Sequence, residues 1–199
     1  MKYFFLVSTI LVFFSLTALS QTKMIINKHD GTSDSIYLAD IKSISFMNNP
    51  NLIKNGSFDS DLQNWIIIGD GPNPYHPEDP GRADFTIENG VVEIDIKNQG
   101  ISIWSIMLYQ RVTFEKGATY IISFDAKSDF ETEIISNVAE ENGNWTVYSG
   151  DKKFVLSNTM KTYSYQFTMS ATGQALFQFC LGTLGTGKLY FDNIILTKQ

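Results

Sequence analysis

Apolar and polar residues alternate along most of the chain from residue 51 onward. In the segment VVEIDI, Val92, Ile94 and Ile96 fall on one side of an extended backbone, and the two acidic residues between them fall on the other. The same two-residue period recurs in three later segments, at residues 119–127, 163–169 and 174–181. No stretch in this part of the sequence shows a sustained period of 3.6 residues, so the pattern predicts an all-β domain of short strands.

Turn-forming residues separate the alternating segments. Glycine follows a polar residue at Asn89-Gly90, Lys116-Gly117, Asn142-Gly143 and Ser149-Gly150. Many short strands at this spacing predict an antiparallel β-sandwich. Four of the five prolines lie in the loop GPNPYHPEDPGRAD. This loop is too rich in proline for a central strand and is long enough to cover or border a binding surface.

Residues 1–20 have the pattern of a secretory signal peptide. Lys2 precedes a mostly apolar run over residues 3–14, and small residues follow at Ala18 and Ser20. The run is about a dozen residues long, whereas a membrane span needs roughly 20, so a retained anchor is the weaker alternative. We expect cleavage after Ser20 and a secreted or periplasmic protein that is not inserted in a membrane.

The rest of the chain divides into a small appendage and one larger domain. Residues 21–47 contain two strand-forming runs around an Asp-Gly turn and predict a β-hairpin. Their pattern resembles a short N-terminal segment of exported proteins from Bacteroidota-like bacteria. Residues 48–50 form a polar linker, and residues 51–199 suit a single packed domain. The single cysteine, Cys180, excludes an intramolecular disulfide, and its apolar surroundings in the sequence predict a buried, unreactive thiol.

The charge balance narrows the range of partners. The formal net charge is −6 and the sequence pI is about 4.8, which disfavours nucleic acid and anionic membrane surfaces as partners. A neutral polymer such as a glucan or a xylan imposes no such demand. Aromatic residues make up 14% of the chain and could serve as platforms for sugar rings, although the cores of β-sandwiches also use many aromatic residues.

Three phrases in order along the chain resemble the family 4/9 carbohydrate-binding modules that are appended to bacterial cellulases, xylanases and laminarinases. They are the opening NLIKNGSFDSDLQNW, the middle stretch ISIWSIMLYQRVTFEKGATYIISFDAKSD and the end FQFCLGTLGTGKLYFDNIIL. The resemblance covers residues 51–198. It implies a jelly-roll β-sandwich of the galactose-binding-like kind, with a β-glucan or xylan chain bound in a cleft on the concave face of one sheet.

The resemblance also implies a structural calcium ion, because members of the family usually hold one. Asp59 matches the acidic position after G-x-F, where glutamate is more usual, and Asp192 matches the acidic position of the last strand. Calcium prefers six to eight hard oxygen ligands, which carboxylates and backbone carbonyls supply. A third ligand is expected from residues 84–90. The alternative is that the two carboxylates only cap turns or accept hydrogen bonds from backbone amides.

Strand parity suggests which side chains would contact sugar. If Ala175, Phe177 and Phe179 face the core, then Gln174 and Gln178 share the opposite face, roughly 13 Å apart along the strand. Amides both donate hydrogen bonds to hydroxyls and accept them. An ordinary solvated strand face is the alternative interpretation.

Further candidates for the cleft come from the neighbouring segments, and they are Trp104, Tyr109, Gln110, Asn137, Trp145 and Tyr148. Parity places Trp104 and Gln110 on the face of Leu108, and Tyr109 on the other face. Trp104 is therefore either a core residue or a platform. Trp145 and Tyr148 follow a turn, where a ring can border a cleft, and Asn137 has the outward parity of its strand.

No catalytic constellation emerges from the sequence. Glycoside hydrolysis needs two carboxyl groups that flank the bond. The pairs Glu131 with Glu133 and Glu140 with Glu141 have the pattern of solvated acids. We therefore expect an exported, non-catalytic module that binds β-linked polysaccharide. A structural or adhesion module without sugar binding is the alternative, and a hydrolase assignment would follow only from the family's association with glycoside hydrolases.

Overall fold

The computed structural model describes residues 22–27, 31–40 and 50–199, and the chain divides into two compact units, Met1–Met47 and Asn48–Gln199. In the first unit, strands β1 (Lys23–Asn27) and β2 (Ser33–Tyr37) pair in antiparallel fashion, and the 3-10 helix η1 (Leu38–Asp40) follows. The predicted signal peptide, the hairpin turn and residues 41–49 lie outside the described residues.

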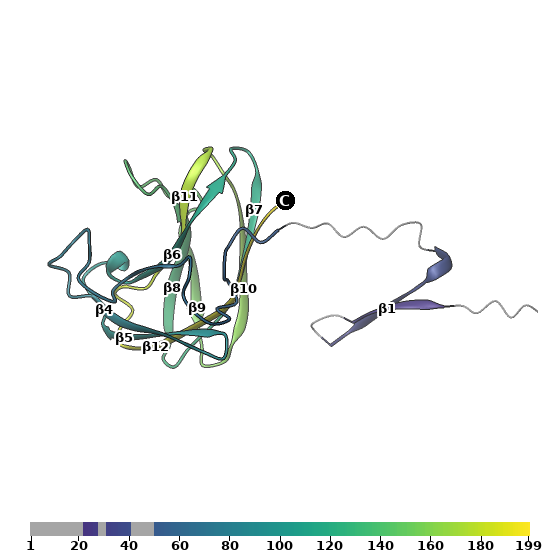
Figure 1. Ribbon diagram of the computed structural model, residues 1–199, viewed down its shortest axis with the longest axis horizontal. Helices are drawn as coiled ribbons and strands as arrows, with labels where there is room; N and C mark the ends of the chain where they lie inside the picture. The colour runs from purple at the N-terminus through teal and green to yellow at the C-terminus, as the bar shows by residue number, and fades with distance from the viewer. Residues whose placement is uncertain (1–21, 28–30, 41–49) are drawn as a thin grey trace, which may run out of the picture. The chain divides into compact units, whose positions relative to one another are not determined.

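Two five-stranded antiparallel sheets form the second unit, and Figure 1 shows them as the main body of the ribbon. One sheet has the order β10–β7–β12–β5–β4. Its strands are β4 (Arg82–Glu88), β5 (Val91–Asn98), β7 (Thr119–Ser128), β10 (Lys161–Thr168) and β12 (Gly187–Lys198). The other has the order β3–β6–β11–β8–β9. Its strands are β3 (Ile66–Ile68), β6 (Met107–Phe114), β8 (Thr132–Ala139), β9 (Lys152–Leu156) and β11 (Gly173–Cys180), and the 3-10 helix η2 (Ile103–Ser105) precedes β6.

The predicted all-β sandwich is thus confirmed, and its core follows the predicted alternation. In β11, the side chains of Ala175, Phe177 and Phe179 are fully buried between the sheets. Phe124 of β7 and Phe179 pack edge to face at 4.9 Å between ring centroids. Trp65 is also in the core. Among the described residues, no helix is long and apolar enough to cross a membrane.

The two ends of the domain are joined by backbone contacts. The amide of Leu52 donates to the carbonyl of Leu196 at 2.8 Å, and the side chain of Asn51 both donates to the Ile194 carbonyl and accepts from the Leu196 amide, each at 2.9 Å. The opening segment is an irregular turn rather than a regular strand. Gly56 lies so close to the last strand that a Cβ there would stand 2.1 Å from the carbonyl oxygen of Ile194. The closure of the domain therefore requires glycine at this position.

The substitution Gly56→Ala should destabilise the domain by about 1–3 kcal/mol, because the added methyl group meets backbone atoms that cannot rotate away. Urea unfolding followed by tryptophan fluorescence measures this loss. Gly71→Ala is the matched control, since a Cβ at Gly71 meets only the end of the Arg82 side chain at an ordinary 3.7 Å. Equal stability of the two variants would contradict the assigned role of Gly56.

Candidate functional site

A groove of about 410 Å³ lies over the face of the β3–β6–β11–β8–β9 sheet that points away from the core. Its floor comes from alternate residues of three central strands, and these are Met107, Tyr109, Asn137, Leu176, Gln178 and Cys180. These positions have the outward parity of their strands, yet all six are buried. The sheet is therefore buried on both sides at its centre.

A row of polar side chains crosses the middle of the floor. Strand pairing places Gln178 directly opposite Tyr109 on one side and Asn137 on the other. The Gln178 amide nitrogen donates to Asn137 Oδ1 at 2.8 Å, and Asn137 Nδ2 donates to a carboxylate oxygen of Asp151 at 2.7 Å. Apolar residues lie on both sides of this row, among them Leu176.

Two titratable groups of the floor are held in their neutral forms. Burial, with a smaller contribution from the nearby Tyr75 phenol, raises the pKa of Tyr109 to about 12. Burial, with a smaller contribution from the charge of Asp151, raises the pKa of Cys180 to about 12. The Cys180 thiol is therefore protonated at neutral pH, which agrees with the prediction of a buried, unreactive thiol.

Aromatic rings from separate loops form the walls of the groove. Tyr75, Trp104 and Trp145 all line it, and each is about half exposed. Tyr75 and Trp145 approach edge to face with ring centroids 6.4 Å apart, and His76 lies 6.4 Å from Trp104. The proline-rich loop, which was expected to cover or border a surface, thus borders this groove through Tyr75 and His76.

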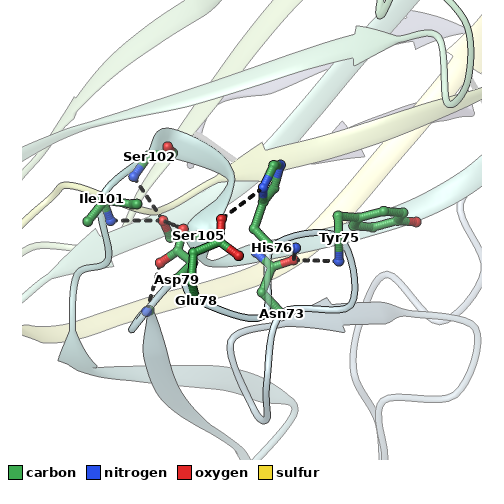
Figure 2. Close-up of polar contacts among 9 residues, drawn as sticks. Asn73, Tyr75, His76, Glu78, Asp79, Ile101, Ser102 and Ser105 are labelled. Atoms are coloured by element: carbon green, nitrogen blue, oxygen red, sulfur yellow. Dashed lines mark hydrogen bonds and ion pairs between the residues drawn. The ribbon is translucent and has the colours of Figure 1, made fainter.

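Buried polar contacts hold the proline-rich loop in place (Figure 2). The Asn73 side-chain oxygen accepts from the amides of Tyr75 and His76 at 3.0 and 3.2 Å, which bends the backbone where both wall residues are attached. Farther along the loop, Asp79 accepts a hydrogen bond from the Ser105 hydroxyl of η2, which directly follows Trp104. The loop and the 3-10 helix are thereby fixed to each other.

Ser105 is the centre of this arrangement. Its hydroxyl oxygen accepts from the amides of Ile101 and Ser102 at 3.1 and 2.9 Å, while the hydroxyl donates to Asp79. A Cβ at Gly100 would lie 2.2 Å from the Ser105 Cβ. The packing against Ser105 therefore leaves no room for a side chain at position 100.

The loop that carries Trp145 is held by a different carboxylate. The Glu140 side chain accepts hydrogen bonds from the amides of Asn144 and Thr146 at 3.2 and 3.4 Å. Trp145 between them has a φ of 53°, in the left-handed region that a bulky residue rarely occupies. Such a conformation persists where the surroundings impose it. The Glu140 contacts thus help to set where the indole lies.

The structure brings five of the predicted contact residues to the groove, and these are Trp104, Tyr109, Asn137, Trp145 and Gln178. Strand parity alone groups Trp104 with Leu108, which faces the core. Because η2 interrupts the extended backbone before β6, parity does not carry back from Leu108 to Trp104, and the indole lies in the groove wall.

Three other predicted contact residues lie outside the groove. Gln110 has the core-facing parity of β6, and its amide pairs with the backbone of Lys54, accepting at 3.0 Å and donating at 2.6 Å. Tyr148 packs against the main core. Gln174 is exposed at the start of β11, beyond the lining of the groove.

Asp151 and His76 also line the groove, although no sequence motif pointed to either residue. Asp151 precedes β9, whose pairing of Ser136 with Lys152 brings it level with Asn137. No local sequence motif predicts this register between β8 and β9. The cluster of prolines around His76 was the available signal for the wall.

The predicted calcium ligands belong to a different part of the domain. Asp192 is on β12, in the other sheet, and Asp59 follows the opening turn. Partial burial raises the pKa of Asp192. A hydrogen bond from the Asn193 amide opposes this shift, while the negative charges of Asp125 and Asp59 raise the pKa further. The Asp125 carboxylate accepts a hydrogen bond from the Asn193 side-chain amide at 2.9 Å. Within the described residues, no group of three or more His, Cys, Asp or Glu side chains is placed to hold a metal ion.

Comparison with known proteins connects this geometry to a family. The family model described as a carbohydrate binding domain (CBM_4_9) matches residues 50–186. A solved structure described as "CBM4 structure and function" is 27% identical, with a TM-score of 0.67, and the alignment covers 74% of this chain and 99% of that one. No curated protein matches the chain.

Two further structures share the fold at lower identity. The second N-terminal cellulose-binding domain of Cellulomonas fimi β-1,4-glucanase C is 20% identical, with a TM-score of 0.60, over 78% of this chain and 99% of that one. TmCBM61 in complex with β-1,4-galactotriose is 14% identical, with a TM-score of 0.52, over 75% of this chain and 99% of that one.

Replacing Ser105 with alanine should loosen the wall of the groove without disturbing the packing around its Cβ. The amides of Ile101 and Ser102 lose their acceptor and the buried Asp79 loses a donor, so we expect a stability loss of about 1–3 kcal/mol. Hydrogen exchange should accelerate at these two amides by at least about tenfold. Ser164→Ala, at an exposed position of β10, is the control. Unchanged exchange in Ser105→Ala would refute the role given to this hydroxyl.

Proposed function

This chain belongs to the carbohydrate-binding domain family that its residues 50–186 match, and we propose that it is an exported, non-catalytic module that binds a β-linked polysaccharide, a glucan or a xylan. The observation that carries the proposal is the groove itself. Half-exposed aromatic rings from separate loops stand beside a buried row of amides on an apolar floor.

This arrangement suits the chemistry of a sugar chain. A pyranose ring has apolar C–H faces, which pack against aromatic side chains, and a polar rim of hydroxyls, which exchange hydrogen bonds with amides. Asn137 and Gln178 supply amides, while Trp104, Trp145 and Tyr75 supply rings. Among related folds, the Cellulomonas fimi domain is named as cellulose-binding and another was solved with β-1,4-galactotriose, which supports a carbohydrate as the ligand.

The acidic residues around the groove favour binding over hydrolysis. Hydrolysis needs two carboxyl groups that flank the scissile bond. Asp151 is the one carboxylate among the described residues that line the groove. Glu141 pairs with Arg111, Glu133 pairs with Lys153 at 2.9 Å, and Glu140 is occupied by its own loop.

Affinity electrophoresis through gels that contain laminarin, xylan, barley β-glucan or hydroxyethylcellulose tests the proposal. We expect at least one polymer to retard the wild-type protein. Trp104→Ala and Trp145→Ala should each weaken that binding about tenfold, or about 1.4 kcal/mol, because each substitution removes an aromatic ring that a bound sugar would cover. Tyr190→Ala, an aromatic change on the other sheet, should bind like the wild type. Absence of retardation by all four polymers would refute the proposed function and favour a structural or adhesion role.

We further propose that Asp59 and Asp192 hold a structural calcium ion. The two carboxylates are close enough for the charge of Asp59 to raise the pKa of Asp192, and a divalent cation would neutralise their repulsion. Hard oxygen atoms are the ligands that calcium prefers. Since the described residues offer no third acidic ligand, backbone carbonyls and water would complete the shell.

Calcium should raise the melting temperature of the wild type, and a chelator should reverse the effect. Asp192→Asn should abolish this response while leaving the calcium-free protein at least as stable, because it removes a charge that the fold disfavours. The raised pKa of Asp192 also predicts a pH dependence of the calcium-free protein, because the folded state disfavours the ionised carboxylate. Its stability should fall as the pH rises from the ordinary carboxyl pKa of 3.8 through the higher pKa of Asp192 in the folded state. A wild-type midpoint that ignores both calcium and chelator would contradict the site.

A further inference from the structure

We propose that Asp151 is a positioning residue that fixes which atoms of Asn137 and Gln178 the groove offers to a ligand, an inference that rests on the proposed sugar-binding role of the groove. The three side chains form one hydrogen-bonded series across β11, β8 and the residue that precedes β9. Gln178 donates to Asn137 at 2.8 Å, and Asn137 donates to Asp151 at 2.7 Å.

The order of donors and acceptors in this series follows from its last member. An ionised carboxylate can only accept hydrogen bonds, so Asn137 must turn its Nδ2 toward Asp151. Its Oδ1 then faces Gln178, which must answer with its Nε2 rather than its oxygen. A reversed amide at either position would bring two acceptors together or two donors together. The single charge of Asp151 thus determines the orientation of both amides.

Gln178, at the end of the series, has one side-chain acceptor atom without a hydrogen-bond donor among the described residues. Its Oε1 accepts no hydrogen bond from any of the described residues, whereas the Oδ1 of Asn137 is already engaged. The Gln178 side chain lines the groove, so this oxygen is the atom that a sugar hydroxyl would meet as donor. With the opposite orientation, the groove would present two N–H donors there instead, and it would favour a different arrangement of hydroxyls.

The burial of the series makes this orientation consequential. Asn137 is 2% exposed and Gln178 is 8% exposed, so water cannot readily replace a mismatched partner. Asp151 itself is exposed, and its surroundings include Lys153, whose pKa is raised mainly by the ion pair with Glu133 and slightly by Asp151. Other charges on this part of the sheet can therefore be changed without touching the amide series.

Asp151→Asn removes the constraint with the least change of shape, because asparagine can present either an oxygen or an N–H₂ group to Asn137. Glu133→Gln is the matched control, since it also removes one negative charge near Lys153 but has no contact with the amides. Two measurements are made on each variant: the ¹⁵N–¹H resonances of the Asn137 and Gln178 side-chain amides, and retardation in gels of laminarin, xylan, barley β-glucan and hydroxyethylcellulose.

The expected result is that Asp151→Asn shifts both pairs of side-chain amide resonances and weakens binding to the retarding polymer about tenfold. Glu133→Gln should leave the resonances and the binding as in the wild type, and Asp151→Glu, which keeps an acceptor-only group, should restore most of both. The backbone spectrum shows that each variant is folded.

Two outcomes would overturn the proposal: unshifted amide resonances in Asp151→Asn, or shifted resonances with unchanged binding. Failure of the wild type to bind any of the four polymers is a different result, because it would refute the proposed function of the groove. The resonances alone would then decide whether Asp151 orients the two amides.

Discussion

The structure depends on one strand, β11, that is buried on both of its faces. Ala175, Phe177 and Phe179 complete the core between the sheets, while Leu176, Gln178 and Cys180 form the floor of the groove. Burying a polar group on such a strand without a hydrogen-bond partner costs free energy. This constraint explains why the one polar floor residue of β11, Gln178, is tied into a hydrogen-bonded series.

The groove is consequently a rigid floor with walls added from loops. The hydrogen bonds between antiparallel strands position the side chains of the floor, whereas the loops of the walls need other contacts to hold them. Two carboxylates supply those contacts. Asp79 accepts a hydrogen bond from the Ser105 hydroxyl, and Glu140 accepts hydrogen bonds from amides of its own loop. Aromatic rings that are half exposed would otherwise be free to collapse onto the apolar floor.

The last strand, which closes the domain, does not line the groove. The opening segment and β12 are joined through Asn51 and Gly56 on the sheet that does not carry the groove. The candidate calcium carboxylates of Asp59 and Asp192 belong to this closure. A cation there would act on stability, and its loss should reach the sugar contacts only through unfolding.

The sequence by itself determined the all-β class, the core-facing positions and the importance of the proline-rich loop, because alternation and turn residues are local properties of the chain. It also indicated the outward parity of Tyr109, Asn137 and Gln178. Tertiary structure decided the rest. Sequence parity left Trp104 as either a core residue or a platform, and the 3-10 helix before β6 places it in the groove wall. Gln110, a predicted sugar contact, instead pairs with the Lys54 backbone on the core side. Asp151 joined the groove only through the register of β9. Register and backbone pairing are relations between distant segments, and no local pattern of residues encodes them.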